Sequence, residues 1–165
     1  MFGFSGLSCF AGTQPNNNEF NNTSVPSPDA PAPAVLALWD DLNPENANCN
    51  EYCAGRVLVN TDNDRAVIWY NDVARWYSGD MEAYFDFQIV LYPTGKIRIN
   101  YRTINGSPTA TIGIQNQDGT DGLLVSFLTD YIHDQLTLEY FTGETPAWIT
   151  FDEGANEGQI LSGLT

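Results

Sequence analysis

The stretch 37–60, ALWDDLNPENANCNEYCAGRVLVN, gathers most of the side chains that could do chemistry. It begins with two adjacent carboxylates, Asp40 and Asp41, and continues to Cys49 and Cys53, which are four positions apart. Such residues could form an acid–base pair, a metal site or a disulfide-closed loop. Adjacent residues on a strand point to opposite faces, so the two aspartates are poorly placed to act as a facing catalytic pair.

Two interpretations of the acidic segment remain. One carboxylate could cap a turn through the backbone N–H groups near Asn43. Alternatively, Asp40, Asp41 and Asn43 could bind calcium, which takes about six to eight oxygen ligands. The stretch NQDGTDG (116–122) offers a second oxygen set in Asp118 and Asp121, although its glycines indicate a turn first.

The spacing of Cys49 and Cys53 predicts a local disulfide that fixes the shape of a loop. The closed loop is short, so the chain-entropy contribution lies below the ~3 kcal/mol expected for fifteen residues. Zinc bound by both, with Cys9 and His133, would lack the paired short spacings of zinc modules. The count of three cysteines leaves the partner of Cys9 open.

The sequence disfavours catalysis, because its only histidine, His133, has no nucleophile motif to act with. No serine or cysteine lies in a nucleophile motif, so we predict that the chain is not an enzyme. Aromatic side chains are the better candidates for ligand contact. Trp76, Tyr77, Tyr70 and Trp69 could stack on a sugar ring or anchor a protein interface, or they could simply pack in the core or cover a loop.

The elements that must position these residues alternate with a period of two. The alternating segments are 56–60, 65–73, 83–92, 96–104, 109–115, 123–127, 135–141 and 147–151. Phe85, Phe87 and Ile89 should face the core, whereas Arg98 and Arg102 should face solvent. Short strands with Gly, Asn and Asp turns predict an antiparallel β-sandwich of roughly nine or ten strands. The Asn- and Pro-rich segment 12–34 should form an extended loop over the sheet surface.

Composition limits the classes of partner that the chain could bind. The chain has 165 residues and a net charge of −15. A phosphate backbone or an anionic membrane would repel it, so we expect no nucleic acid partner and no membrane insertion. No apolar run is long enough to span a membrane.

Three stretches, taken in order, resemble a known family. They are PSPDAPAPAVLALWDDLNP (26–44), YFDFQIVLYPTGKIRINY (84–101) and ATIGIQNQDGTDGLLVSF (110–127). Together they resemble the nidogen-like domain and related β modules of secreted and cell-surface bacterial proteins. The resemblance implies an all-β, extracellular, non-catalytic module associated with adhesion or matrix assembly, and it supplies no set of binding residues.

We therefore expect a nidogen-like sandwich over residues 1–145, followed at 146–165 by a last strand or the lead-in to another module. Its expected function is structural or adhesive, with other copies of itself or other surface and matrix proteins as partners, and assembly by strand addition into a filament or matrix. Residues 1–6 or the tail after Pro146 are the expected donors. The alternative is a carbohydrate-binding accessory module of a secreted hydrolase.

Overall fold

The computed structural model of the chain describes residues 22–45, 53–76, 83–106 and 108–141, and all regular structure within them is β. The strands are β1 (Ala34–Trp39), β2 (Leu42–Asn43), β3 (Arg56–Thr61), β4 (Ala66–Arg75), β5 (Tyr84–Leu91), β6 (Ile97–Asn105), β7 (Thr111–Gln115), β8 (Gly122–Phe127) and β9 (Thr137–Tyr140). These nine strands confirm the all-β prediction. The expected strand at 147–151 and the expected donor segments lie outside the described ranges.

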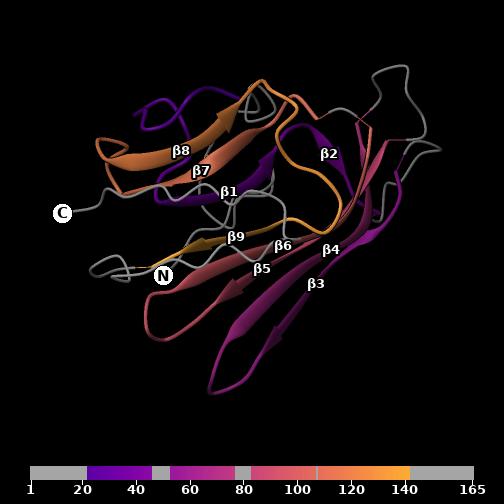
Figure 1. Ribbon diagram of the computed structural model, residues 1–165, viewed down its shortest axis with the longest axis horizontal. Coiled ribbons are helices and arrows are strands. Elements are labelled where there is room, and N and C mark those ends of the chain that lie inside the picture. Colours follow the sequence, from indigo (N-terminus) through magenta and orange to yellow (C-terminus); the bar gives the residue numbers. More distant parts are fainter. Residues whose placement is uncertain (1–21, 46–52, 77–82, 107, 142–165) are drawn as a thin grey trace, which may run out of the picture.

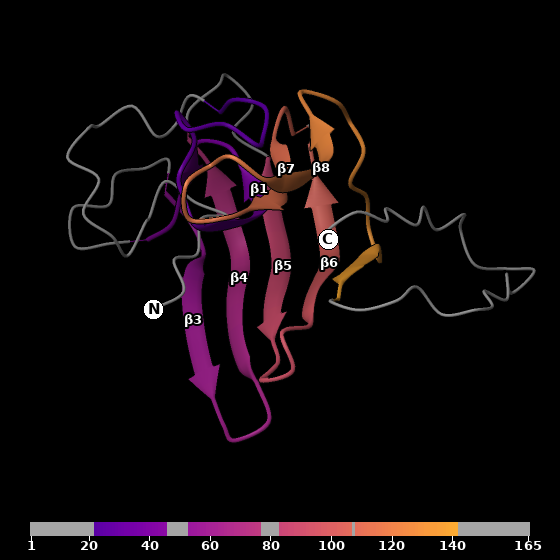
Figure 2. The same ribbon diagram turned by 90° about the vertical axis from the view of Figure 1, so that its left-hand side faces the viewer.

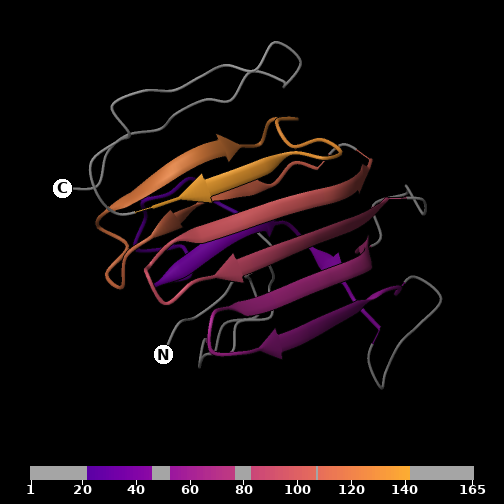
Figure 3. The ribbon, with the colours of Figure 1, turned by 60° about the horizontal axis from the view of Figure 1, so that its bottom comes forward.

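The strands form two antiparallel sheets that pack face to face (Figure 1). The smaller sheet has the order β1-β7-β8, and the larger has the order β2-β4-β5-β6-β9 with β3 also paired to β4. In Figure 3, β3 and β9 lie at opposite edges of the larger sheet. No helix among the described residues is long and apolar enough to cross a membrane.

The core lies between the sheets and comes largely from the alternating strands β5 and β6. Phe85, Phe87, Ile89 and Ile99 have no exposed surface, as the alternation predicted. The ring of Tyr70 stacks on Phe87 with 4.4 Å between centroids. Because one face of each strand is buried, the opposite side chains form a continuous outer face on the larger sheet.

A loop covers the other side of the smaller sheet. Val25 and Ala30 pack with Leu36 and Trp39, so β1 is buried on both faces. The amide of Gln115 accepts a hydrogen bond from the backbone N–H of Ser27 and donates to backbone carbonyls at Ala30 and Pro31. Residues 22–33 therefore lie over the sheet, as expected for that part of the 12–34 segment.

The hairpin of β3 and β4 extends past the smaller sheet (Figures 1 and 2). Val59 points to the inner side, opposite the buried Ile68, yet it is 68% exposed. Most of β3 is exposed on both faces. This hairpin therefore presents strand surface that the sandwich leaves uncovered.

Candidate interaction surface on the larger sheet

Two β-bulges bring a charged cluster together on the outer face. In β4, Asn71 and Asp72 lie between the paired residues Tyr70 and Val73, and Asp72 has a φ of 52°. In β6, Arg102 is the extra residue between the pairings of Asp86 and Phe87. Each bulge adds one residue opposite β5, so both neighbouring strands crowd side chains around the same position.

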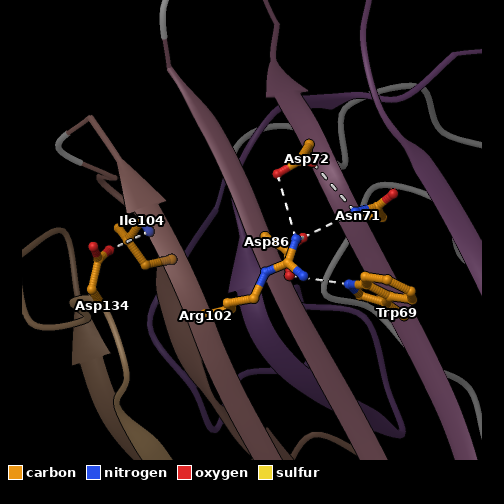
Figure 4. A network of polar contacts seen from close by, with 7 residues as sticks. All are labelled: Trp69, Asn71, Asp72, Asp86, Arg102, Ile104 and Asp134. Carbon is orange, nitrogen blue, oxygen red and sulfur yellow. Dashed lines mark hydrogen bonds and ion pairs between the residues drawn. The ribbon is translucent and has the colours of Figure 1, made fainter.

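That position is Asp86, whose side chain is only 2% exposed although it lies on the solvent side of the sheet. Its Oδ1 accepts a hydrogen bond from the indole Nε1 of Trp69 at 3.0 Å, and its Oδ2 accepts one from Asn71 Nδ2 at 3.0 Å. Arg102 completes the shell with an ion pair to Oδ2 (Figure 4). The carboxylate is buried beneath its own donors, which satisfy a charge that would otherwise be costly to desolvate.

The cluster fixes the orientation of an aromatic ring. The guanidinium carbon of Arg102 lies 5.5 Å from the centre of the Trp69 ring, in addition to the bond from the indole to Asp86. Asp72 lies 4.0 Å from the same guanidinium and is mostly exposed. Trp69 is therefore held at both its N–H and its ring, which lowers the conformational entropy that it would lose on binding a ligand.

A glycine permits the bulge in β4. Gly55 has a φ of +76°, and a Cβ there would lie 2.2 Å from the backbone oxygen of Asp72. Only glycine fits such a close approach of two backbones. On the other side of β5, the N–H of Ile104 in β6 donates a 2.7 Å hydrogen bond to Asp134, beyond the last pairing of β6 with β9 (Figure 4).

The acidic pair predicted from the sequence lies elsewhere, after β1. Asp40 is 6% exposed, its Oδ1 accepts a hydrogen bond from the N–H of Asp41, and its Oδ2 lies 3.2 Å from Arg75. Burial, and then repulsion from Asp40, raise the pKa of Asp41 against the opposing effect of Arg75. Asp40 thus caps backbone as one interpretation predicted, although at the next residue and not near Asn43, whose side-chain nitrogen is buried without a partner among the described residues.

The second predicted oxygen set forms a turn. The side-chain oxygen of Asn116 accepts hydrogen bonds from the N–H groups of Thr120 and Asp121, and Gly119 has a φ of +65°. Asp118 and Asp121 are exposed. They follow the end of β7, whereas Asp40 follows Trp39, which pairs with the start of β7. The two predicted oxygen sets therefore lie at opposite ends of that strand. The described ranges hold no cluster of three His, Cys, Asp or Glu suited to a metal, and calcium stays a prediction.

The remaining residues predicted from the sequence lie in different parts of the molecule. Cys49 and Tyr77 lie outside the described residues, so the Cys49–Cys53 disulfide stays a prediction. Trp76 is 48% exposed at the end of β4, where a ligand could reach it. Tyr70 is 2% exposed in the core, so its suggested ligand contact is wrong and the core interpretation holds. His133 is an exposed loop residue whose ring contacts the backbone at Asp134.

Asp86 and its hydrogen bond to Trp69 were not predicted from the sequence. A signal existed in YFDFQIV, where a single carboxylate interrupts a strand of aromatic residues. Alternation correctly predicted that Arg102 faces solvent, but it could not show that a bulge brings Arg102 beside Asp86.

Comparison with known proteins identifies a family but no more specific function. A family model described as "NIDO related" matches residues 4–146, which is most of the chain. No curated protein and no solved structure matched. The two-sheet architecture and this match agree with the resemblance carried by the three sequence motifs. The chain belongs to the NIDO-related family.

Proposed function

We propose that the chain is a non-catalytic extracellular module that associates with a second copy of itself through the free edge of β3. Membership of the NIDO-related family supports an extracellular structural module. The observation that carries the self-association is the exposed edge of β3, a six-residue strand with no pairing on its outer side among the described residues. Such an edge is a template for adding another strand.

The backbone pattern shows which groups are available. The N–H of Asp62 donates to the carbonyl of Arg65, which fixes the hydrogen-bonded position nearest the turn. Because such positions alternate in an antiparallel pair, Val57, Val59 and Thr61 direct their N–H and C=O groups away from β4. The carbonyl of Gly55 follows the same direction, because it accepts from the N–H of Glu45 and not from β4.

One register of two antiparallel β3 strands suits this edge best. With Val59 opposite Val59 of the second copy, Val57 lies opposite Thr61 and all outward-facing groups find partners. The same register places Arg56, which also pairs with Glu45, opposite Asp62, which also pairs with Arg65, so opposite charges adjoin on both sides of the two-fold axis. It also covers Val59, the most exposed of the large apolar side chains described. The pairing is symmetric and closes after two copies, so a filament would need a further contact, such as one at the edge of β9.

The test uses a proline that removes the edge donor without disturbing the hairpin. Because the N–H of Val59 points away from β4, Val59→Pro should leave the β3–β4 ladder intact. Sedimentation velocity as a function of concentration should show a monomer–dimer equilibrium for the native chain and a monomer for Val59→Pro. Val59→Thr keeps the N–H and the β-branch, and it should still dimerise.

Two results would overturn the proposal: a native chain that is monomeric at every concentration, or a Val59→Pro variant that dimerises like the native chain. The pairing register of the two β3 strands can be tested separately. Val59→Cys should form a disulfide across the axis, because hydrogen-bonded pairs have Cα atoms about 5.5 Å apart. Leu58→Cys is the matched control, since its counterpart is displaced by two residues along the strand and lies too far away. Equal cross-linking of both variants would refute this register.

A further inference from the structure

A single row of uncharged side chains crosses the outer face of the larger sheet. Successive pairings align Leu58 with Trp69, Trp69 with Gln88, Gln88 with Asn100, and Asn100 with Thr137. Five strands contribute, and neighbouring strands lie about 4.8 Å apart, so the row extends for about 19 Å. It runs from an apolar residue through an aromatic ring to two amides and a hydroxyl.

We infer that this row is a binding site for a neutral oligosaccharide. The pyranose ring of a sugar has an apolar face that can lie against an indole, and its hydroxyl groups pair well with amides, which both donate and accept. The spacing of the strands is close to the length of one hexose, so successive side chains could meet successive sugar units.

The side chains of the row are available for contact. Leu58 is 43% exposed, and Trp69, Gln88 and Asn100 are partly exposed. The amide of Gln88 has no hydrogen-bond partner among the described residues. Asn100 uses its oxygen to accept from the hydroxyl of Thr137 at 3.1 Å, which leaves its amide nitrogen as a donor. Trp69 is already fixed by Asp86 and Arg102, so its ring would lose little freedom on binding.

Charge selects a neutral ligand over an acidic one. Charged residues flank the row on both sides, but they are paired with each other: Arg102 with Asp86 and Arg98 with Glu139. No cation remains unpaired along the row to receive a carboxylate or sulfate. The chain as a whole carries −15, which would repel a polyanion. These properties leave uncharged hydroxyl groups as the chemistry that the row can recognise.

The experiment is isothermal titration calorimetry with cellohexaose, mannohexaose and chitohexaose, and with hexagalacturonate as the acidic comparator. At least one neutral hexamer should bind, and the acidic one should bind more weakly. Trp69→Ala should weaken binding at least about tenfold, and Gln88→Ala, which leaves the Asp86 cluster intact, about three- to tenfold. Phe141→Ala is the matched control, because it removes an exposed aromatic side chain outside the row and should change nothing.

The inference fails if none of the neutral hexamers binds, if hexagalacturonate binds as tightly as they do, or if Gln88→Ala binds like the native chain. Gln88→Ala decides the matter even if Trp69→Ala does not fold. The outcome is independent of self-association, since Val59→Pro leaves every residue of the row in place and should bind the hexamer as the native chain does.

Discussion

Asp86→Ala should be among the most destabilising substitutions on the solvent side of the larger sheet. The carboxylate is 2% exposed and receives bonds from Trp69, Asn71 and Arg102. A hydrogen bond to a charged group contributes about 1.5–3 kcal/mol. Part of that sum is offset, because the variant no longer has to desolvate a carboxylate and its former donors can reach water. We therefore expect a loss of about 3 kcal/mol in the free energy of unfolding.

Asp72→Asn supplies a matched control, because Asp72 contacts the same guanidinium from a side chain that is 56% exposed and 4.0 Å away, and asparagine tolerates its φ of 52° as aspartate does. An exposed pair of this kind contributes little, so the control should change the free energy of unfolding by less than about 0.5 kcal/mol. Urea denaturation followed by far-UV circular dichroism would measure both, and the melting temperature of Asp86→Ala should fall by about 6–12 °C. A loss below about 1 kcal/mol for Asp86→Ala, or equal losses for the two variants, would refute this account of the buried carboxylate.

Three further variants test the core and one sheet edge. The hydroxyl of Tyr101 donates to the buried carbonyl of Ala37, so Tyr101→Phe should lower the free energy of unfolding by about 1–2 kcal/mol in urea titrations. The hydroxyl of Tyr140 is buried without a partner among the described residues, so Tyr140→Phe should be neutral or stabilising, and equal losses for the two would contradict both assignments. Burial raises the pKa of Glu139, but bonds from Lys96 and Arg98 outweigh it and leave that pKa below its usual value. The carboxylate therefore stabilises the fold above the pKa of the unfolded chain, and this stability is lost as pH falls through the folded pKa. Glu139→Gln should accordingly be less stable than the native chain at neutral pH and equal to it in acid, and a pH-independent difference in melting temperature would count against this pairing.

Alternation predicted the larger sheet well because its strands obey it. In β6 the side chains of one face, such as Ile99 and Tyr101, are buried and those of the other, such as Arg98 and Arg102, reach solvent, so the sequence carries a period of two that assigns each side chain to a face. In β5 the same period is visible in Phe85, Phe87 and Ile89, although Asp86 and Val90 on the outer face are buried as well. The same rule cannot be applied to β1, where AVLALW is buried throughout. Its second face is covered by residues 22–33, and the period of two disappears when both faces are buried.

The Asp86 cluster could not be predicted because it depends on breaks in that period. Trp69, Asp86 and Arg102 come from three strands, and their contact requires one additional residue in each of β4 and β6. Nothing in the letters of RINYRTIN specifies which residue of β6 bulges. Asp40 shows a related failure. The register of β1 shifts after Leu36, so alternation no longer assigns a face to the residues beyond Trp39, and it could not show that Asp40 is buried.

The two proposed properties would reinforce each other if the two-fold axis of the dimer is perpendicular to the sheet. Pairing of β3 with β3 in that way leaves the outer faces of both copies on the same side, and Leu58 of each copy lies next to the seam. The two rows would then form parts of one surface, and a long neutral polymer could contact both copies at once. Binding at two linked sites raises the apparent affinity without any new contact. Val59→Pro should therefore bind a hexamer like the native chain but bind an extended polymer of the same sugar more weakly. If both forms bind the polymer equally at concentrations where the native chain is dimeric, the two rows do not act together. Self-association through β3 and sugar binding on the outer face would then be unrelated properties.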